Sequence, residues 1–270
     1  MVDKRKIAVV IPVYLANELH DDFTRQTLRS IHSEKYDLQN YVIINYSLPQ
    51  FKPQAEDYKH LHLTVVDNPA GNHVGSAWNM GIKMGFEAGA EYVIVANNDI
   101  ILHKTAIDNL VDFADSHPEF ILWSAAEWQN LRTIFTVEDV EFTTDFDEHP
   151  HFSCFMVNKK TIDTVGWFDE KLHTAYFEDG EYHYRILLSG NKASKTATSR
   201  FYHYGSRSIR VDEDLFMKNR RTYEDNRKYI RSKWNTDFHG KAFDPPESVF
   251  NEEGIYKHPF NNPKNDWRFW

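Results

Sequence analysis

The sequence predicts an α/β protein with an open sheet flanked by helices, and three observations support this class. The stretch from Glu91 to Leu102 is an apolar run that breaks once, at Asn97-Asn98-Asp99. Its first part has no polar alternation, which is typical of a strand covered on both faces, as in a parallel sheet. Two further apolar runs, Ile7–Tyr14 and Tyr41–Tyr46, enclose a segment with helical periodicity. The order strand, helix, strand predicts a right-handed βαβ unit.

The first 75 residues fit this plan element by element. Pro12 cannot donate to a strand ladder and therefore marks the exit of the first strand. Residues 22–33 carry an apolar face at helical spacing and predict an amphipathic helix. Residues 61–66 predict a third strand. The stretch 67–75 that follows is dense in Gly, Asn and Pro, which is typical of a loop that a ligand approaches.

Two helices are expected on either side of the central run. Ser76 can cap the first of them, and Gly89 suits its C-terminal end. The second contains residues 107–114 at helical spacing and ends at His117-Pro118. The first 120 residues are therefore expected to form one α/β layer system.

The second half of the chain continues with a strand at 152–157 and a short helix at 159–165. A further helix is expected to start at Glu178-Asp179 and to be closed by Gly190. Acidic residues at a helix N-terminus are stabilised by the helix dipole, so capping alone is one explanation of this pair. A chemical role is the other. Residues 200–203 predict a late strand.

Composition limits the function classes. The 270 residues include 31 Lys and Arg against 40 Asp and Glu, a formal net charge of −9. Such a surface repels polyanions as a whole, which argues against nucleic acid as a partner. The one cysteine, Cys154, cannot form an internal disulfide, and we therefore expect a reducing, cytoplasmic location. No apolar run approaches the roughly 20 residues that cross a bilayer, so a soluble protein is expected.

Several well-known site motifs are missing. The glycines do not form G-x-G-x-x-G, and the sequence contains neither a P-loop nor a G-x-S-x-G elbow. His60-x-His62 and His149-x-His151 could each pair as zinc ligands, but cysteine or carboxylate partners at finger spacing are missing. These four are therefore predicted to be surface histidines.

A set of motifs in a fixed order identifies a family. The motifs are Ile11-Pro12-Val13-Tyr14, Asn72-x-x-Gly75 followed by Asn79 and Gly81, Asn97-Asn98-Asp99, Gly166-Trp167-Phe168-Asp169-Glu170, Glu178-Asp179 and His203-x-Gly205-x-Arg207. Together, over about residues 6 to 210, they resemble the family 2 glycosyltransferases of the GT-A fold. Within that family the closest likeness is to a rhamnosyltransferase-like branch. The resemblance implies a GT-A, Rossmann-like open mixed sheet flanked by helices, with a C-terminal helical extension and an extended tail.

The resemblance also implies a divalent metal, Mn²⁺ or Mg²⁺. Asp99 matches the family's metal-binding aspartate, and His203 matches a histidine that looks like a further metal or diphosphate ligand. Asn97 stands where many members have a second aspartate. The triplet therefore offers one carboxylate and a neutral amide, which weakens the expected metal site.

The remaining site residues follow from the same matches. Asp179 matches the catalytic base, and Glu178 is the reserve candidate. The donor is expected to be a UDP-sugar, with dTDP- and GDP-sugars as alternatives. Asn45 stands where the resemblance leads one to expect an acid that reads the base, and this departure leaves the base unassigned. The residues expected to bind the donor are Pro12, Val13, Tyr14, Asn45, Asn72, Gly75, Asn79, Asn97 and Asn98.

The implied reaction is an inverting transfer of a hexose or deoxyhexose to a glycan or other hydroxyl acceptor. Two alternatives stay open. Asn97 and Asn45 replace acids, which would suit a catalytically inert sugar- or nucleotide-binding relative. A nucleotidyltransferase shares the layout but typically has a Gly-rich, basic first loop, whereas Pro12-Val13-Tyr14-Leu15 has no such residues.

The expected division of the chain is a catalytic domain at 1–210 and a C-terminal part at 211–270. Residues 214–234 predict a helix that docks on the domain, with basic residues expected on a solvated face. These basic residues allow a polyanionic acceptor or peripheral contact with a membrane. The last 30 residues are rich in aromatics, which predicts an arm packed on the domain or on a second copy of the chain.

Overall fold

The computed structural model describes residues 4–71, 73–134, 146–147, 149–205 and 212–234. The strands are β1 Lys6–Leu15, β2 Asp37–Ser47, β3 Leu63–Asp67, β4 Tyr92–Ala96, β5 Ile100–Leu102, β6 Phe120–Glu127, β7 Phe146–Asp147, β8 Cys154–Asn158 and β9 Lys192–His203. The helices are α1 Glu18–Ser30, α2 Val74–Glu87, α3 Ala106–Ser116, α4 Lys159–Val165, α5 Glu178–Leu188 and α7 Glu213–Trp234, with 3₁₀ turns η1 Pro49–Phe51 and η2 Ala55–Leu61.

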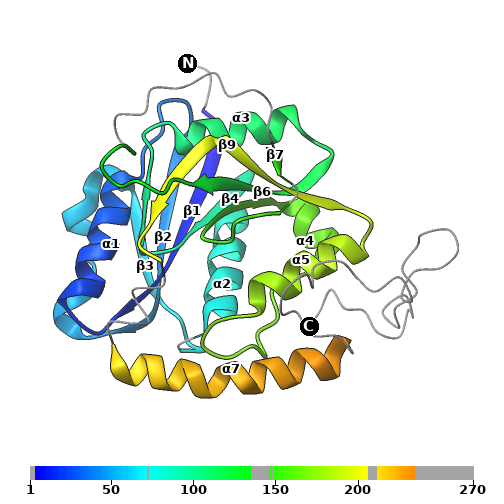
Figure 1. Ribbon diagram of the computed structural model, residues 1–270. Helices are drawn as coiled ribbons and strands as arrows, with labels where there is room; N and C mark the ends of the chain where they lie inside the picture. The colour runs from blue at the N-terminus through cyan, green and yellow to red at the C-terminus, as the bar shows by residue number, and fades with distance from the viewer. Residues whose placement is uncertain (1–3, 72, 135–145, 148, 206–211, 235–270) are drawn as a thin grey trace, which may run out of the picture.

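The strands form one open mixed sheet in the order β3-β2-β1-β4-β8-β6-β9-β5, with β7 paired to β9 (Figure 1). Strands β3, β2, β1 and β4 are parallel to one another. Strand β8 is antiparallel to β4 and to β6, β6 is parallel to β9, and β5 is antiparallel to β9. This is the GT-A, Rossmann-like α/β class that the sequence predicted.

The sheet has a separate hydrophobic core on each face, and β1 contributes to both. Ile7, Val9 and Ile11 pack with α1 and α3 on one side. Ala8 and Val10 pack with α2, α4 and α5 on the other. Because successive strand residues point to opposite faces, a strand between two helix layers must be apolar at every position. That requirement explains the unbroken apolar run.

Two glycines allow α2 to pack closely on the sheet. A Cβ at Gly81 would lie 2.1 Å from a Val10 methyl group, and one at Gly85 would lie 2.7 Å from the Cβ of Ala8. Neither space can hold a methyl group. The backbone of α2 therefore approaches β1 more closely than larger side chains would permit.

Three predicted boundaries were wrong. Helix α1 starts at Glu18, four residues before the predicted start, because the Asn17 side chain caps it by accepting from the His20 N–H at 3.0 Å. Ser76 lies inside α2 and is not its cap. Pro12 does not end β1, which pairs with β2 as far as Leu15, whereas pairing with β4 stops at Val10.

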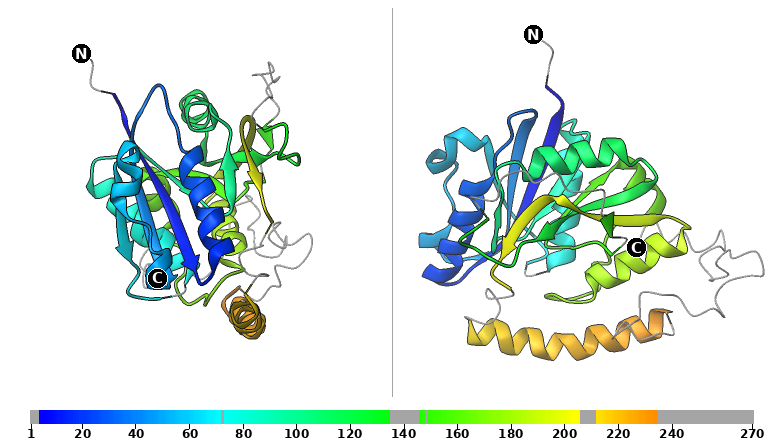
Figure 2. Two further views of the ribbon diagram at one scale, coloured as in Figure 1. Left: turned by 90° about the vertical axis from the view of Figure 1, so that its left-hand side faces the viewer. Right: turned by 45° about the horizontal axis from the view of Figure 1, so that its top comes forward.

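The predicted C-terminal helix is present as α7, which lies beneath the carboxyl ends of the parallel strands (Figure 1, Figure 2). It packs against α5 through a small cluster that includes Leu172, Phe177, Tyr184, Ile230 and Trp234. The predicted aromatic arm lies outside the described residues. Over the described ranges, no helix has the length and apolarity that a membrane span requires.

Candidate active site

Asp99 and His203 meet because their strands pair. Strand β5 begins directly after Asp99, and its antiparallel register with β9 sets Ile100 opposite His203. The Nε2 of His203 lies 3.2 Å from the Oδ1 of the buried Asp99. The Tyr204 N–H donates to the Asp99 carbonyl at 3.0 Å. The structure thus brings together the carboxylate and the imidazole that the sequence offered as metal ligands.

The two side chains suit a cation that is shared with a substrate. Burial lowers the pKa of His203, but the hydrogen bond that its ring donates to Asp99 and the negative charge of Asp99 leave that pKa raised overall. Across the described ranges, no three His, Cys, Asp or Glu side chains converge on one point. Mn²⁺ and Mg²⁺ nevertheless fit two protein ligands, because they can take their other ligands from water and phosphate oxygens.

Asn97 and Asn98 are adjacent but have different surroundings. The Asn97 N–H donates to the Ser153 carbonyl at 2.9 Å, and its side chain is partly exposed beside Asp99 in the chain. The Asn98 amide donates to Thr24 Oγ1 at 3.0 Å and is buried. Asn98 therefore ties the end of β4 to α1.

His151 belongs to this site, although the sequence predicted a surface histidine there. Its Nε2 lies 3.1 Å from Glu127 Oε2, and its ring centroid lies 6.2 Å from that of His203. The charge of His151 also lowers the pKa of Asp179. His151 therefore connects the Asp99–His203 pair with the candidate base. The other three histidines of the two motifs are exposed, as predicted.

Glu178 and Asp179 open α5 as adjacent carboxylates: Glu178 is buried, whereas Asp179 reaches solvent although much of the protein surrounds it. Burial, together with the charge of Asp179, raises the pKa of Glu178 to about 8. Burial also raises the pKa of Asp179, but the Gly180 N–H, which donates to Asp179 Oδ1 at 2.7 Å, opposes that rise. Adjacent carboxylates in one apolar site cannot both ionise easily. The two carboxylates therefore favour a shared proton, and the Gly180 N–H favours the ionised form of Asp179.

Helices α2 and α5 hold the loop Gly166–Glu170 through hydrogen bonds. Asn79 of α2 accepts from the Phe168 N–H at 2.9 Å and donates to the Phe168 carbonyl at 2.9 Å and to Glu170 at 2.8 Å. Arg185 of α5 donates to the carbonyls of Val165 and Trp167 at 2.7 and 2.8 Å. These contacts fix the backbone of the loop from both sides.

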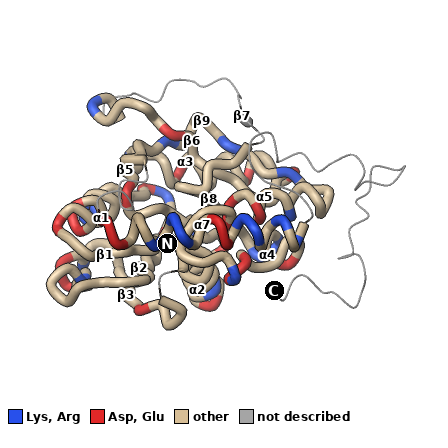
Figure 3. The backbone as a smooth tube through the Cα atoms, turned by 60° about the horizontal axis from the view of Figure 1, so that its bottom comes forward, with Lys and Arg blue, Asp and Glu red and all other residues tan. Residues whose placement is uncertain are grey.

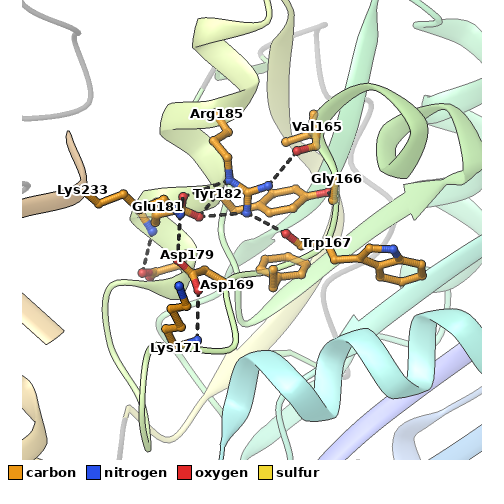
Figure 4. A network of polar contacts seen from close by, with 12 residues as sticks. Val165, Gly166, Trp167, Asp169, Lys171, Asp179, Glu181, Tyr182, Arg185 and Lys233 are labelled. Atoms are coloured by element: carbon orange, nitrogen blue, oxygen red, sulfur yellow. Dashed lines mark hydrogen bonds and ion pairs between the residues drawn. The ribbon is translucent and has the colours of Figure 1, made fainter. Parts of the chain in front are cut away.

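Helix α7 adds a buried ion network to the same loop (Figure 4). Lys233 Nζ lies 2.7 Å from Asp169 and 2.8 Å from Glu181, and Arg185 completes the network at 2.8 Å from Glu181. Tyr229 also donates to Asp169, at 2.8 Å. The sequence placed Lys233 on a solvated face, which is wrong: its side chain is 7% exposed. Its partners lie far away in sequence, so helical charge patterning could not find them.

A second group of predicted residues lies at the ends of β1 and β2. The rings of Tyr14 and Tyr46 stack with centroids 5.0 Å apart. The Asn45 Oδ1 accepts from the Asn68 amide at 2.8 Å. Burial, followed by the charge of Asp212 just before α7, raises the pKa of Tyr14 to about 12. The N-terminal end of α7 therefore lies near this group, while its C-terminal end lies against α5.

The other predicted donor residues contribute in different ways. Pro12 and Val13 are buried in β1. A Cβ at Gly75 would lie 3.4 Å from the Asp169 carbonyl, so α2 and the 166–170 loop are in close contact there. Asn79 uses its amide to hold that loop. Asn72 lies outside the described residues.

The fold is shared with several solved structures. Residues 1–349 of TarS from S. aureus superpose with a TM-score of 0.59 at 14% identity, covering 88% of this chain and 67% of that one. GalNAc-T7 with UDP, GalNAc and Mn²⁺ gives 0.57 at 14% identity, covering 75% and 44%. The mannosyltransferase PcManGT from Pyrobaculum calidifontis, with GDP-Man and Mn²⁺, gives 0.53 at 16% identity, covering 78% and 61%. At these identities the likeness shows the fold alone.

The sequence comparison assigns the family. No curated protein matches the sequence. Residues 8–165 match the model of glycosyl transferase family 2. Because this match covers more than half of the 270 residues, the chain belongs to glycosyltransferase family 2.

Proposed function

We propose that the protein is an inverting glycosyltransferase that moves a sugar from a nucleotide-diphosphate sugar to an acceptor hydroxyl. One observation carries the proposal: the pKa of Asp179 is raised overall, the charge of His151 acts on it, and the His151 ring lies 6.2 Å from that of His203 in the Asp99–His203 pair. Transfer of a sugar with an anionic leaving group requires a base for the acceptor hydroxyl and a cation near the leaving group. Membership of family 2 supports the same chemistry.

Asp179 acts as the general base. It takes the proton of the acceptor hydroxyl while that oxygen attacks the anomeric carbon. The bond from this carbon to the diphosphate oxygen breaks on the opposite face, so one displacement inverts the configuration. The proton ends on Asp179 and the electron pair on the departing diphosphate. Its raised pKa makes Asp179 a stronger base than a carboxylate with an ordinary pKa.

Asp99, His203 and the partly exposed Asn97 would hold a divalent cation. When bound, Mn²⁺ or Mg²⁺ neutralises the charge that develops on the leaving diphosphate. His203 would bind the cation as a neutral imidazole, and His151 lies on the same side of the site. The Tyr14 and Tyr46 rings offer flat surfaces for a nucleobase, and Asn45 offers its amide.

The donor is proposed to be a UDP-sugar, with GDP- and dTDP-sugars as alternatives. Solved structures with this fold carry UDP-GlcNAc, UDP or GDP-Man, and two contain Mn²⁺. The rhamnosyltransferase-like motifs favour a hexose or deoxyhexose as the transferred group. A glycan or other hydroxyl compound is the proposed acceptor. The buried, unpaired Cys154 fits a reaction in the cytoplasm.

A catalytically inert, nucleotide-sugar-binding relative is the second candidate. It is favoured by one observation, the amides Asn97 and Asn45 at positions where acids are expected. Turnover separates the two candidates.

The test is Asp179→Asn, measured by release of nucleoside diphosphate from UDP-, GDP- and dTDP-sugars with Mn²⁺. The variant keeps the side-chain shape but cannot accept the proton, so kcat should fall by about 10²- to 10⁴-fold with little change in donor affinity. Asp37→Asn, an exposed carboxylate at the start of β2, is the control and should keep wild-type turnover. Donor binding without turnover by the wild type would favour the inert relative. Undiminished turnover by Asp179→Asn would make Glu178 the next candidate base.

A further inference from the structure

The segment just before the carboxylate pair has an unusual backbone. Thr174, Tyr176 and Phe177 have φ angles of 61°, 77° and 77°. L-residues other than glycine rarely adopt this left-handed region, because the Cβ crowds the backbone. Three such residues within four positions persist only where surrounding contacts hold them, and clusters of this kind occur at functional sites.

This backbone decides where the carboxylates point. Phe177 is the N-cap of α5, and Glu178 and Asp179 are the first two residues of that helix. If Phe177 relaxed toward a common φ, the chain would enter α5 at another angle. The oxygens of Asp179 would then move relative to His151, whose charge acts on the pKa of Asp179.

Asn226 of α7 contacts this segment with both ends of its amide. Its Oδ1 accepts from the His173 N–H at 3.0 Å, and its Nδ2 lies 2.9 Å from the His173 carbonyl, 3.4 Å from that of Ala175 and 3.3 Å from that of Tyr176. Asn226 is 1% exposed. A carboxylate, hydroxyl or ammonium group of the same reach could not both accept from this N–H and donate to several carbonyls.

Two further residues of α7 pack against the same segment. The Tyr223 ring lies 5.8 Å from that of Tyr176 and 4.9 Å from that of Phe177, centroid to centroid. Ile230 is in one apolar cluster with Phe177. Residues 223, 226 and 230 are one turn apart, so they form a single stripe on the helix.

We propose that Asn226 is a positioning residue for the transfer reaction: it holds His173–Phe177 in the strained conformation that presents Glu178 and Asp179. This inference rests on the proposed function of Asp179. Asn226 does not touch the reacting atoms and acts through the segment. Helix α7 thereby completes the catalytic site, although it is more than 30 residues away from the carboxylates in sequence.

The docking of α7 does not depend on Asn226. Tyr229 and Lys233 bind Asp169 one and two turns further along, and Trp234 packs its side chain against Tyr184 with ring centroids 5.0 Å apart. Loss of Asn226 should therefore release the segment while α7 stays in place. That separation makes the proposal testable.

The experiment compares Asn226→Ala and Asn226→Asp with Asn219→Ala in the full chain. Asn219 is the other buried asparagine of the described part of α7, and its Oδ1 has no hydrogen-bond partner there. Hydrogen exchange of the amides of residues 171–180 reports the segment, and exchange of α7 reports docking. Titration with the UDP, GDP or dTDP that binds gives the number of competent sites, and kcat is expressed per site.

We expect faster exchange at 171–180 in both Asn226 variants, with unchanged exchange in α7. The kcat per site should fall by about 10- to 100-fold with donor KM within about 3-fold, because misplacement of a catalytic group affects the transition state. Asn219→Ala should match the wild type. A merely structural role would lower the number of sites and leave kcat per site unchanged.

The proposed function and the role of Asn226 would be overturned by different results. If the wild type releases no nucleoside diphosphate from any donor, the proposed function fails and takes the catalytic part of this inference with it. If the wild type turns over and Asn226→Ala keeps its kcat per site, the inference alone is overturned. Unchanged exchange at 171–180 would overturn it as well, whatever the activity.

Discussion

Glu178 and Asp179 are neighbours in sequence, yet their environments separate their protonation. Asp179 accepts the Gly180 N–H and feels the charge of His151, whereas the first influence on Glu178 besides burial is the negative charge of Asp179 itself. The same helix start therefore places two carboxylates in surroundings that act differently on their pKa values. Acid–base sites are commonly built from titratable pairs whose pKa values are driven apart.

The raised pKa of Glu178 predicts a pH-dependent cost of folding. The folded-state pKa of about 8 exceeds the usual 4.5, so the folded protein binds this proton more tightly, and that stability is lost as pH rises through 8. Glu178→Gln removes the titration. Relative to the wild type, we expect it to raise Tm on the order of 5 °C at pH 8 and much less at pH 5. A gain in Tm that is equal at both pH values would contradict this assignment.

Asp99 can be tested through binding alone. Asp99→Ala should remove the Mn²⁺-dependent part of the thermal shift that a nucleotide sugar produces. A ligand at about 100 times its Kd adds about 2.7 kcal/mol to the free energy of unfolding, so the loss is measurable. Asp37→Ala is the control and should keep the shift. A full Mn²⁺-dependent shift in Asp99→Ala would place the cation elsewhere.

At the scale of elements, α7 is attached to the 166–170 loop and to α5 by ion pairs. The network contains two anions and two cations: Asp169, Glu181, Arg185 and Lys233. Breaking a buried pair costs more than forming one gains, because the remaining charge loses both its partner and water. The pKa of Asp169 and that of Glu181 show the same balance: burial raises each, but the cations around them leave both lowered.

Lys233→Met should therefore destabilise the protein by about 3 to 5 kcal/mol at pH 7. Lowered carboxylate pKa values contribute stability above about pH 4.5, and that contribution is lost as pH falls through the folded-state pKa values. The deficit of Lys233→Met should therefore shrink below about pH 4. Denaturant unfolding across this range measures it.

Lys228→Met is the matched control on the same helix. Lys228 pairs with Asp225 at 3.6 Å, and both side chains are about three-quarters exposed. An exposed pair of this kind contributes within about 1 kcal/mol. Equal losses for the two variants would show that the buried network does not fasten α7.

At the scale of the whole molecule, α7 crosses the carboxyl edge of the sheet from the Tyr14 end to α5, and its outer surface carries both signs of charge (Figure 3). Its exposed charged residues are Lys218, Arg220, Arg221, Lys228 and Arg231 against Glu213, Asp214, Glu224 and Asp225. This near balance on a chain of net charge −9 favours a neutral acceptor over a polyanion.

We therefore expect the acceptor KM to change by less than about 3-fold between about 50 and 200 mM salt. A polyanionic acceptor would instead lose affinity steeply over this range, since its binding releases counterions. The triple variant Arg220→Glu, Arg221→Glu, Lys228→Glu provides the second arm and should leave KM unchanged. A steep salt dependence that the triple variant flattens would reverse the conclusion.

The sequence by itself determined the layered α/β class and most of its elements. The strands around β1, β2, β4 and β8 and the helices α4, α5 and α7 were predicted close to their observed bounds. These features depend on local periodicity and on glycines and caps, which a sequence displays directly. The order of motifs along the chain also indicated the family, which the match over residues 8–165 confirmed.

Only the tertiary structure decided which residues come together at the candidate active site. Four contacts each join residues that are 50 or more positions apart in the sequence. They are the pairs Asp99 with His203, His151 with His203, Lys233 with Asp169, and Asn226 with His173. No local pattern records such contacts, because they arise from strand register and helix docking. The sign of each pKa shift depends in turn on burial, which exists only once the chain has folded.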